Sequence, residues 1–421
     1  MISSFSREIS DVTNDITSRK YDVAIIGGGI TGLSSALYAV KAGASVILLE
    51  KDRIGCGASG KSGGQLVTGV APDIRKVIHT YDLEIAQRLW EYSLLAVNVV
   101  RGIVERHKID CCLEDGHLLV AHTTREAEQL AGQMRILQEN FGDKGWDWVS
   151  GNQLQIAAGS DVFAGGVLDL RGGRLDPAAY VEGLAAAAKC AGARIQEFCP
   201  ALAVDSDIGA VETSVGTIAA ENIILAVDGS LPKFVPEVRQ LMTCVWTAQM
   251  VISNAHSHDS QIMSPMYAVA DTRSITTYYR SLSDDGLLFG HATSVSKQHN
   301  FRLLRKLGHH LHSILPQWST STSYRVETGQ IPTSWNEVPF IRRGQGRLVY
   351  AGGYSGQGIA WATLAGRILA SEVIEGSDDF TFFNRIPLKV IHSRLMQELC
   401  VRRNHGAAVF QDYLRRLQLA N

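Results

Sequence analysis

Three glycines near the amino end of the chain have the G-x-G-x-x-G spacing that brings a backbone close to a dinucleotide pyrophosphate. Gly27 permits a tight turn, Gly29 lets the backbone approach the phosphates, and Gly32 lets the next helix pack closely on a strand. The start of that helix would hold the phosphates through its free N–H groups. Glu50, 18 positions after Gly32, is placed to accept hydrogen bonds from ribose hydroxyls. An acid there disfavours a 2′-phosphate, so the pattern predicts a dinucleotide site that does not take NADP.

The elements around these glycines form the βαβ unit that the motif requires. Residues 21–26 are a short run of mostly apolar, branched side chains. An alanine-rich helical stretch follows and stops at Gly43, and residues 45–49 have the pattern of a second buried strand. A chance glycine-rich turn would not have a strand before it, a helix after it and an acid at this distance.

A second glycine-rich loop, R-I-G-C-G-A-S-G-K-S-G-G at residues 53–64, follows Glu50 almost directly. It resembles the flavin-contacting loop of the D-amino-acid oxidase and glycine oxidase (DAO) superfamily, whose R-x-G-x-G-x-S-x-x-x-G-G pattern it matches throughout. A nicotinamide dehydrogenase has no use for such a loop. An exposed Gly/Ser linker is the alternative interpretation, but it does not explain why the loop lies next to a ribose-binding acid.

A third glycine-rich segment, G-G-Y-S-G-Q-G at residues 352–358, lies between a short strand at 347–351 and a helix that continues to about residue 373. In the same superfamily this segment folds back onto the first domain and directs a helix dipole at the pyrimidine end of the flavin. A plain strand-to-helix turn is the alternative, although four glycines in seven positions exceed what such a turn needs.

The resemblance covers roughly residues 20–380 and is closest to the gamma-glutamylputrescine oxidoreductase branch, through residues 57–65, 278–280 with 287–290, and 353–358. It implies FAD as cofactor. Some sarcosine oxidases attach flavin through a cysteine, but residues 324–329 contain none, so noncovalent binding is expected. The predicted cofactor-binding residues are Gly27, Gly29, Ile30, Thr31, Gly32, Glu50, Lys51, Gly57, Ala58, Ser59, Gly63, Gly64, Gln65, Ala201, Gly229, Gly353, Tyr354, Ser355, Gly356, Gln357 and Gly358.

The resemblance implies an FAD-dependent amine oxidase or dehydrogenase acting on CH–NH or CH–NH2 donors. Hydride leaves the carbon that bears nitrogen for the flavin, and the imine hydrolyses to a carbonyl product plus ammonia or an amine. The protein has to bind an unprotonated amine and orient its α-hydrogen, so no obligatory acid/base pair can be read from the sequence. The electron acceptor stays open, because residues 286–290 lack the lysine that oxygen-using sarcosine oxidases place over the flavin.

The carboxylate clamps of the superfamily are missing. Ile331 stands where amino-acid-oxidising relatives carry the arginine of a G-x-R-P stretch, and Ala360 stands where sarcosine oxidases carry a lysine. An uncompensated carboxylate would be costly to desolvate. We therefore expect an amine whose reacting carbon bears no carboxylate, with a gamma-glutamylated polyamine as one candidate. Arg273, Arg280 or Lys61 could instead replace the lost arginine.

Candidate catalytic residues come from a histidine and from aromatic side chains. His291 stands where the branch usually has glycine, and it could contact substrate or assist its deprotonation. A structural histidine is the alternative. Tyr278, Tyr279 and Trp361 could wall an amine pocket with their ring faces, although such residues are more often core, and one of the three is expected there. No metal site is expected, because the 309–312 histidines have no Cys, Asp or Glu at ligand spacing.

The predicted fold class is α/β. A Rossmann-like FAD-binding domain with a central parallel sheet and a β-meander is joined to a discontinuous α+β substrate domain, as in glutathione-reductase-type 2 flavoproteins. The predicted boundaries are 1–19 for a flexible leader; 20–76, 153–236 and 325–378 for the FAD-binding domain; 77–152 and 237–324 for the substrate domain; and 379–421 for a C-terminal helical extension. That extension could dock a partner subunit, but packing on its own domain is the default expectation.

Composition narrows the class of protein. The 421 residues are 45% hydrophobic and 19% charged, which suits a globular chain of two or three units. A net charge of −2 makes nucleic acid an unexpected partner. Seven cysteines without a C-x-x-C pair, and an amino end without a signal-peptide h-region, favour the cytoplasm and no transmembrane segment. An amino-acid or opine oxidase of the same fold and a non-catalytic flavin-binding subunit are the competing hypotheses, and homo-oligomers stay open.

Overall fold

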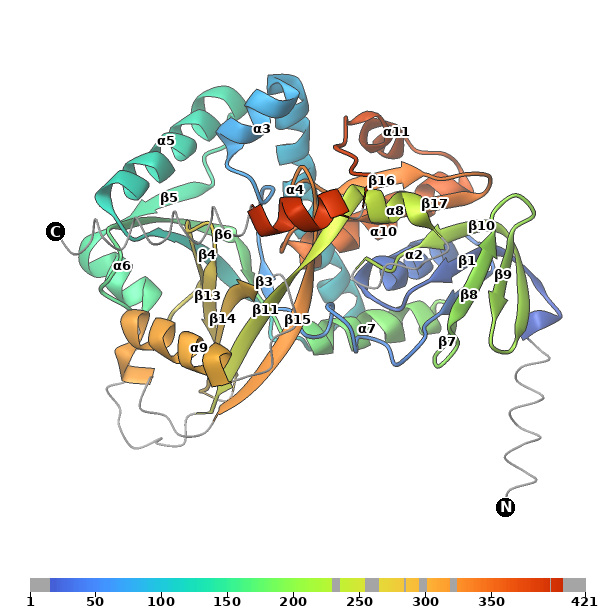
Figure 1. The fold of residues 1–421 in the computed structure, drawn as a ribbon, viewed down its shortest axis with the longest axis horizontal. Coiled ribbons are helices and arrows are strands. Elements are labelled where there is room, and N and C mark those ends of the chain that lie inside the picture. Colours follow the sequence, from blue (N-terminus) through green and yellow to red (C-terminus); the bar gives the residue numbers. More distant parts are fainter. Residues whose placement is uncertain are drawn as a thin grey trace, which may run out of the picture.

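The structure is a computed structural model that describes residues 16–228, 235–253, 265–283, 285–294, 301–318, 324–393 and 395–403. It contains two large β-sheets with helices around them (Figure 1). Most of the predicted leader lies outside the described residues, but Ile16 is fully buried in the core under the first sheet. No helix in the described part of the chain is long and apolar enough to cross a membrane.

The first sheet, sheet A, has the strand order β16-β17-β10-β1-β2-β7, with β8 and β9 continuing from β10. β1, β2, β7, β10 and β17 pair in parallel. The apolar side chains of β1 and β2 are buried on both faces, because one face packs in a core with helices and the other packs in a core that includes residues of β9 and β10. The predicted meander is present as the antiparallel strands β8, β9 and β10, the last of which enters the parallel sheet. The strands are β1 (Lys20–Ile26), β2 (Val46–Leu49), β7 (Arg194–Gln196), β8 (Ala201–Asp205), β9 (Ala210–Thr213), β10 (Gly216–Leu225), β16 (Phe340–Arg343) and β17 (Leu348–Gly352).

Two helices that follow glycine-rich turns cross each other tightly beside sheet A. They are α2 (Ile30–Lys41) and α10 (Gly358–Ile374), and α2 also packs on α7 (Pro177–Cys190). A Cβ at Gly366 of α10 would lie 2.5 Å from the Thr31 carbonyl oxygen of α2, so the crossing needs glycine. The Ser34 hydroxyl donates to the Thr363 carbonyl at 2.7 Å across the same interface. The first and third glycine motifs are thereby held side by side.

The second sheet, sheet B, has the order β15-β11-β14-β13-β12-β4-β6-β3, with β5 paired to β6. Its strands β3, β6 and β15 fall in ranges predicted for the FAD-binding domain, so the predicted boundaries do not coincide with the division between the sheets. Local patterns cannot reveal such long-range pairing. The strands are β3 (Gln65–Leu66), β4 (Glu114–Ala121), β5 (Trp146–Val149), β6 (Gly165–Arg174), β11 (Met242–Ile252), β12 (Ala268–Asp271), β13 (Thr277–Ser281), β14 (Leu287–Ser294) and β15 (Tyr324–Ser334).

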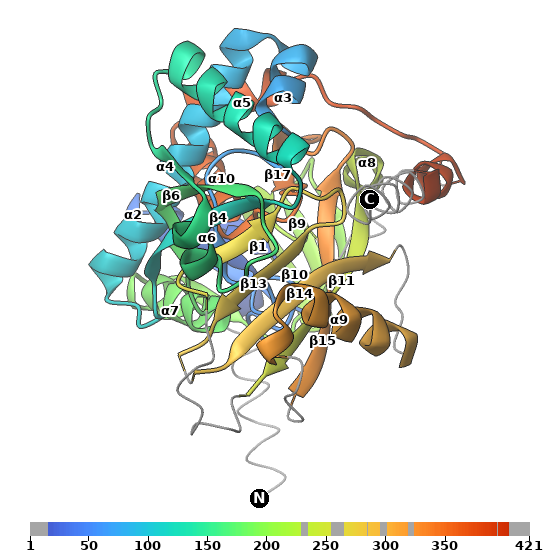
Figure 2. The same ribbon diagram turned by 90° about the vertical axis from the view of Figure 1, so that its left-hand side faces the viewer.

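The two faces of sheet B are covered differently. α9 (Phe301–Ile314) and the 3₁₀ turn η1 (Pro316–Trp318) form a compact apolar core with one face, together with α6 (Gly151–Ala158). On the other side lie α3 (Ile74–Tyr81), α4 (Leu83–His107) and α5 (Thr124–Phe141), and both views place α5 opposite α9 (Figure 1, Figure 2). Side-chain alternation along each strand therefore decides which residues can reach a ligand.

The predicted C-terminal extension begins with a helix that packs on its own domain. α11 (Asp378–Arg385) contacts β16 and α10, and the Arg342 guanidinium donates to the carbonyls of Phe383 and Ile386. A further helical segment covers 395–403, and the rest lies outside the described residues. The remaining helix, α8 (Pro236–Leu241), precedes β11.

Candidate functional site

A cavity of about 1040 Å³ brings the three glycine-rich segments together. Its walls are the loops at the carboxyl ends of β1, β2, β10 and β17 and the face of sheet B opposite α9. The carboxyl edge of a parallel sheet is where α/β folds bind ligands. This volume slightly exceeds the range of about 300–1,000 Å³ common for small-molecule sites, as expected for a dinucleotide together with a substrate.

The first turn is shaped so that only glycine fits at two positions. Gly27 has φ +113°, and a Cβ there would lie 2.4 Å from the Ala226 carbonyl oxygen. A Cβ at Gly32 would lie 1.9 Å from the Gly27 carbonyl oxygen. Residues 27–31 of this turn line the cavity, and the first three of them are glycines without side chains. The cradle suits the close approach of a pyrophosphate.

Glu50 is buried beside this turn and lines the cavity. Its Oε2 accepts from the Gly28 N–H at 2.7 Å, and its Oε1 accepts from the Asp52 N–H at 2.9 Å. These two bonds orient the carboxylate, and each oxygen keeps a lone pair for a further donor. The predicted role of Glu50 towards ribose hydroxyls therefore has the geometry that it needs.

The second loop closes over the start of α2 and reaches sheet B. The Ser59 hydroxyl accepts from the Ile30 N–H at 3.1 Å, which satisfies one free donor at the helix N-terminus. Further along, the Gly63 carbonyl accepts from the Arg280 guanidinium at 2.7 Å. A Cβ at Gly63 would lie 2.6 Å from the Tyr278 ring, so glycine lets the loop lie against that tyrosine.

The third loop is anchored on both sides. Gly353 and Gly356 have positive φ angles of +71° and +94°, and the Gly353 N–H donates to Asp228 Oδ1 at 2.9 Å. Tyr354 is buried, and its hydroxyl lies 2.7 Å from Thr31 Oγ1 of α2. Burial raises the pKa of Asp228 to about 7, and the Gly353 N–H opposes this effect.

Most predicted cofactor-binding residues line the cavity. The exceptions are Gly32 and Gly353, which belong to the first and third turns but do not line the cavity, and Gly229, which lies outside the described residues. The predicted residues that line the cavity are Gly27, Gly29, Ile30, Thr31, Glu50, Lys51, Gly57, Ala58, Ser59, Gly63, Gly64, Gln65, Ala201, Tyr354, Ser355, Gly356, Gln357 and Gly358. Gln357 Oε1 is buried without a hydrogen-bond partner among the described residues.

The three predicted catalytic residues do not line the cavity. His291 faces α9: its Nδ1 lies 3.0 Å from Thr277 Oγ1 and its ring 4.2 Å from the ring of His310. Burial, and after it the positive charges of His310, Lys306 and Arg273, lower the pKa of His291 to about 2, while the Asp271 charge opposes this effect. The position of His291 therefore fits the alternative given above, that of a structural histidine.

Tyr279 and Trp361 are core residues. Tyr279 stacks on Phe289 beneath α9, and its hydroxyl donates to the Ala158 carbonyl at 2.9 Å. Trp361 is 1% exposed and donates to the Gly69 carbonyl at 2.9 Å. Tyr278 is the one of the three aromatic candidates that lines the cavity. Successive residues of a strand point to opposite faces, which separates Tyr278 from Tyr279.

Cationic side chains reach the cavity wall, and Arg273 is the one on sheet B that is engaged in an ion pair. Arg273 lines the cavity and is held by Asp271 at 2.6 Å and by Thr277 Oγ1 at 2.5 Å. Lys61 also lines the cavity, whereas Arg280 does not. Arg273, Arg280 and Lys61 are the residues that could replace the missing carboxylate-binding arginine of the family. Of these, Arg273 and Lys61 lie where a ligand in the cavity could reach them.

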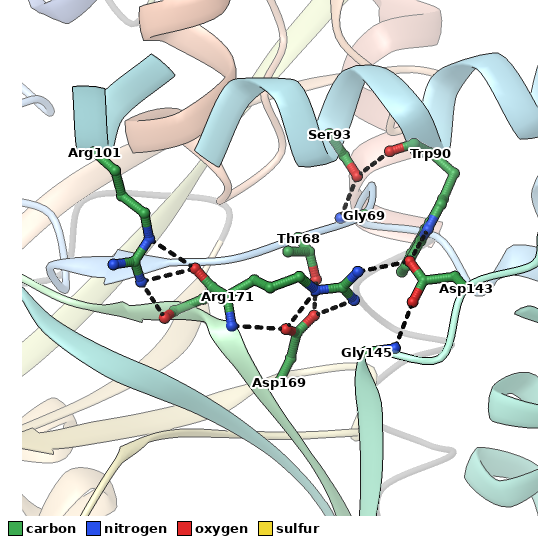
Figure 3. A network of polar contacts seen from close by, with 10 residues as sticks. Thr68, Gly69, Trp90, Ser93, Arg101, Asp143, Gly145, Asp169 and Arg171 are labelled. Atoms are coloured by element: carbon green, nitrogen blue, oxygen red, sulfur yellow. Dashed lines mark hydrogen bonds and ion pairs between the residues drawn. The ribbon is translucent and has the colours of Figure 1, made fainter. Parts of the chain in front are cut away.

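Sequence reasoning missed a polar network between β6 and α4 (Figure 3). Arg171 donates to Asp169 and to Asp143, each at 2.8 Å, and the Thr68 hydroxyl donates to Asp169 Oδ2 at 2.8 Å. The Trp90 indole donates to Asp143 at 2.6 Å. Asp169 lines the cavity. The sequence carries no motif for this network, because its members come from four separate segments.

Comparisons with known proteins agree with this geometry. A family model described as FAD dependent oxidoreductase (DAO) matches residues 22–372. The chain is 30% identical to gamma-glutamylputrescine oxidoreductase of Escherichia coli K12 over 372 residues, covering 87% of this chain and 86% of that protein. It is 29% identical to the probable oxidoreductase OrdL of Haemophilus influenzae over 390 residues, covering 90% and 89%. The crystal structure of glycine oxidase from Geobacillus kaustophilus superposes with a TM-score of 0.71 at 20% identity, covering 87% of this chain and 99% of that one.

Proposed function

The chain belongs to the DAO family of FAD-dependent oxidoreductases, and we propose that it oxidises a C–N bond of an amine whose reacting carbon bears no carboxylate. Bound FAD supplies the hydride acceptor. The protein's own residues bind the cofactor, orient the amine and keep water away from the reacting carbon. Relatives of the family act on amines or on amino acids, so the question is which of these two classes is the substrate.

The residues around the cavity fit FAD bound along its length. The turn at 27–32 and the start of α2 would hold the pyrophosphate, and Glu50 would accept from the ribose. The third loop and the start of α10 would lie at the flavin end, where the helix N-terminus favours negative charge. Gly27 and Gly32 support this assignment, because a Cβ at either position would collide with backbone.

We propose that the FAD is bound noncovalently. Residues 324–329 of β15 contain no cysteine. Cys56 is the cysteine that lines the described part of the cavity, and its sulfur lies within 4.8 Å of carboxylate oxygens of Glu50 and Asp52, at the ribose end. Acid precipitation should therefore release the yellow chromophore into the supernatant.

One observation carries the choice of an amine over an α-amino acid. On the sheet-B side of the cavity, the lining residues Asp169 and Arg273 are both held in ion pairs, Asp169 with Arg171 and Arg273 with Asp271. Ile331, at the position of the family's arginine clamp, also lines the cavity. On this side a substrate carboxylate would therefore meet a buried carboxylate and an engaged guanidinium, which is unfavourable, and Lys61 of the second loop is the lining cation that could oppose this effect.

The test is anaerobic reduction of the flavin by a substrate panel. Primary and secondary amines, including putrescine and its gamma-glutamyl derivative, are expected to bleach the bound flavin, whereas glycine, sarcosine and D-amino acids should not. Bleaching by amino acids alone would reverse the assignment. A flavin that no member of the panel reduces would contradict amine oxidation and favour a binding role.

A further inference from the structure

We propose that Arg280 is a fixed positive charge behind the second glycine-rich loop, and that this charge favours reduction of the bound flavin without contacting the substrate. This role rests on the FAD binding and hydride transfer proposed above. Hydride transfer brings two electrons and one proton to the flavin, so the ring system gains one negative charge. A cation held near that ring system stabilises the reduced state relative to the oxidised one.

Arg280 lies on the face of β13 that is turned toward the cavity. Successive residues of a strand alternate between faces, so Arg280 shares the side of Tyr278, which lines the cavity. Its Nε donates to the Gly63 carbonyl oxygen at 2.7 Å. A Cβ built on Gly64 would lie 2.8 Å from both Nε and Nη2 of the same guanidinium. Gly63 and Gly64 line the cavity, so one short stretch of glycine backbone contacts both the guanidinium and the cofactor space.

The Arg280 side chain is a buried charge that forms no ion pair with a carboxylate in the described part of the chain. The residue is 7% exposed, and its guanidinium donates to the carbonyl oxygens of Gly63 and Ser281. Burial lowers the pKa of Arg280 to about 10, and the charge of Asp176 only partly opposes this effect, so the group is still charged at neutral pH. The Asp176 carboxylate itself caps α7 through two backbone N–H groups. Burying an unpaired charge is costly, and a neutral side chain could anchor the loop without that cost.

Two arginines close to Arg280 in the fold differ from it in this respect. Arg174 of β6 is paired with Glu114 at 2.5 Å, and Arg273, between β12 and β13, is paired with Asp271 at 2.6 Å. In both pairs the carboxylate neutralises the guanidinium over a short distance. The charge of Arg280 is not neutralised in this way among the described residues, so its field extends through the loop into the cavity.

The contact with residues 63–64 places this charge at the flavin end of the proposed cofactor site. Glu50 and the turn at 27–32 mark the ribose and pyrophosphate end. The second loop starts beside that end and reaches sheet B at Gln65, the first residue of β3. A dinucleotide bound from Glu50 onward would therefore bring its ring system to the loop segment that Arg280 holds. Arg280 does not line the cavity, so it acts through its field and not by touching substrate.

The alternative is that Arg280 only anchors the loop, and two variants separate its charge from its hydrogen bond. Arg280→Lys keeps the charge and changes the geometry of the donor, whereas Arg280→Gln keeps a donor and removes the charge. Arg174→Gln is the matched control, because that guanidinium is already neutralised by Glu114. Each variant is purified as the holoenzyme, and the ratio of flavin to protein shows whether it retains FAD.

Two measurements on the flavin report the charge without turnover. The first is the two-electron midpoint potential, and the second is the dissociation constant of sulfite, which adds to an oxidised flavin and leaves a negative charge on the ring system. In Arg280→Gln the sulfite constant should rise at least about tenfold and the potential should fall by about 30 mV, a tenfold change in a two-electron equilibrium. Arg280→Lys and Arg174→Gln should stay within about threefold of wild type at pH 7. Wild-type values in Arg280→Gln, or equal losses in Arg280→Gln and Arg280→Lys, would overturn the role of the charge.

A pH series covers the case in which Arg280→Gln does not retain FAD. Burial lowers the pKa of a lysine readily, whereas an arginine keeps its proton to higher pH. The potential of Arg280→Lys should therefore fall below that of wild type as the pH rises from 7 to 9. A difference from wild type that stays constant over this range would contradict a role of the charge.

These measurements use no amine, so their failure can be told apart from failure of the proposed function. If the variants of Arg280 behave as expected but no member of the substrate panel reduces the flavin, amine oxidation fails and the role of Arg280 stands. If amines bleach the flavin but Arg280→Gln keeps the wild-type potential and sulfite constant, only the role of Arg280 fails.

Discussion

At the scale of single residues, the alternation of side chains along a β-strand decides which candidate residues can reach a ligand in the cavity. Tyr278 and Tyr279 are neighbours, but only Tyr278 faces the cavity, whereas Tyr279 lies beneath α9. His291 is paired with Thr277 across β13 and β14 and shares the α9 side. The correct assignment of His291 and Tyr279 required knowing which face of sheet B meets the cofactor loops.

Asp228 provides a prediction on pH dependence. Its pKa is raised from 3.8 to about 7, mainly by burial. Between these values the folded protein retains a proton that the unfolded chain has released, so this group lowers the free energy of unfolding as the pH rises from 4 to 7, and the loss is complete above 7. The side chain keeps some contact with the cavity, so we expect about 1–3 kcal/mol, less than the shift alone implies at about 1.4 kcal/mol per unit.

The measurement is denaturant unfolding of the holoenzyme and of Asp228→Asn at several pH values. Asn keeps the oxygen that accepts from the Gly353 N–H but does not ionise. The variant should gain stability relative to wild type as the pH rises from 5 to 8. Asp147→Asn, at an exposed position, is the control and should change little. A difference between Asp228→Asn and wild type that does not vary with pH would show that Asp228 is ionised in the fold.

At the scale of elements, the crossing of α2 and α10 holds the first and third glycine motifs together. The Thr31–Tyr354 and Ser34–Thr363 hydrogen bonds link the same pair of segments. The sequence indicated both helices but not their contact, which depends on a glycine in the middle of α10. The geometry of the cofactor site therefore depends on helix packing as well as on its loops.

Gly366 tests this dependence. A Cβ there would lie 2.5 Å from the Thr31 carbonyl oxygen, so Gly366→Ala should cost about 1–3 kcal/mol and weaken FAD retention by separating the helices. Gly102 of α4 has no heavy atom within 4 Å of a built Cβ, and Gly102→Ala should stabilise by about 0.5–1 kcal/mol. Urea melts and the ratio of flavin to protein after gel filtration report both effects. Equal behaviour of the two variants would mean that the helix crossing adapts at no cost.

At the scale of the whole molecule, the cavity joins elements of both sheets. Loops from sheet A and the inner face of sheet B line one continuous space. A cofactor filling it would contact both sheets at once and bind the folded state alone. Ligand binding of this kind raises stability by mass action.

Removal of FAD should therefore destabilise the protein as a whole. At FAD concentrations about 100 times its dissociation constant, the free energy of unfolding should exceed that of the apoprotein by about 2.7 kcal/mol. Thermal unfolding at increasing FAD concentrations measures the effect, and the melting temperature should rise with each increment. FMN, which lacks the adenylate half, is the control and should stabilise less. A melting temperature that does not depend on FAD would contradict FAD binding in this cavity.

Local sequence determined the cofactor half of this protein. Glycine spacing, the βαβ pattern and Glu50 act over short stretches of chain, so their geometry follows from backbone rules that hold in any context. Only the tertiary structure decided the substrate half, because strand pairing, the face of sheet B that meets the cavity and the Asp143–Arg171–Asp169 cluster all depend on contacts between distant segments. A strand pattern shows which residues alternate, but the packing of α9 on one side and the cofactor loops on the other decides which set meets the ligand.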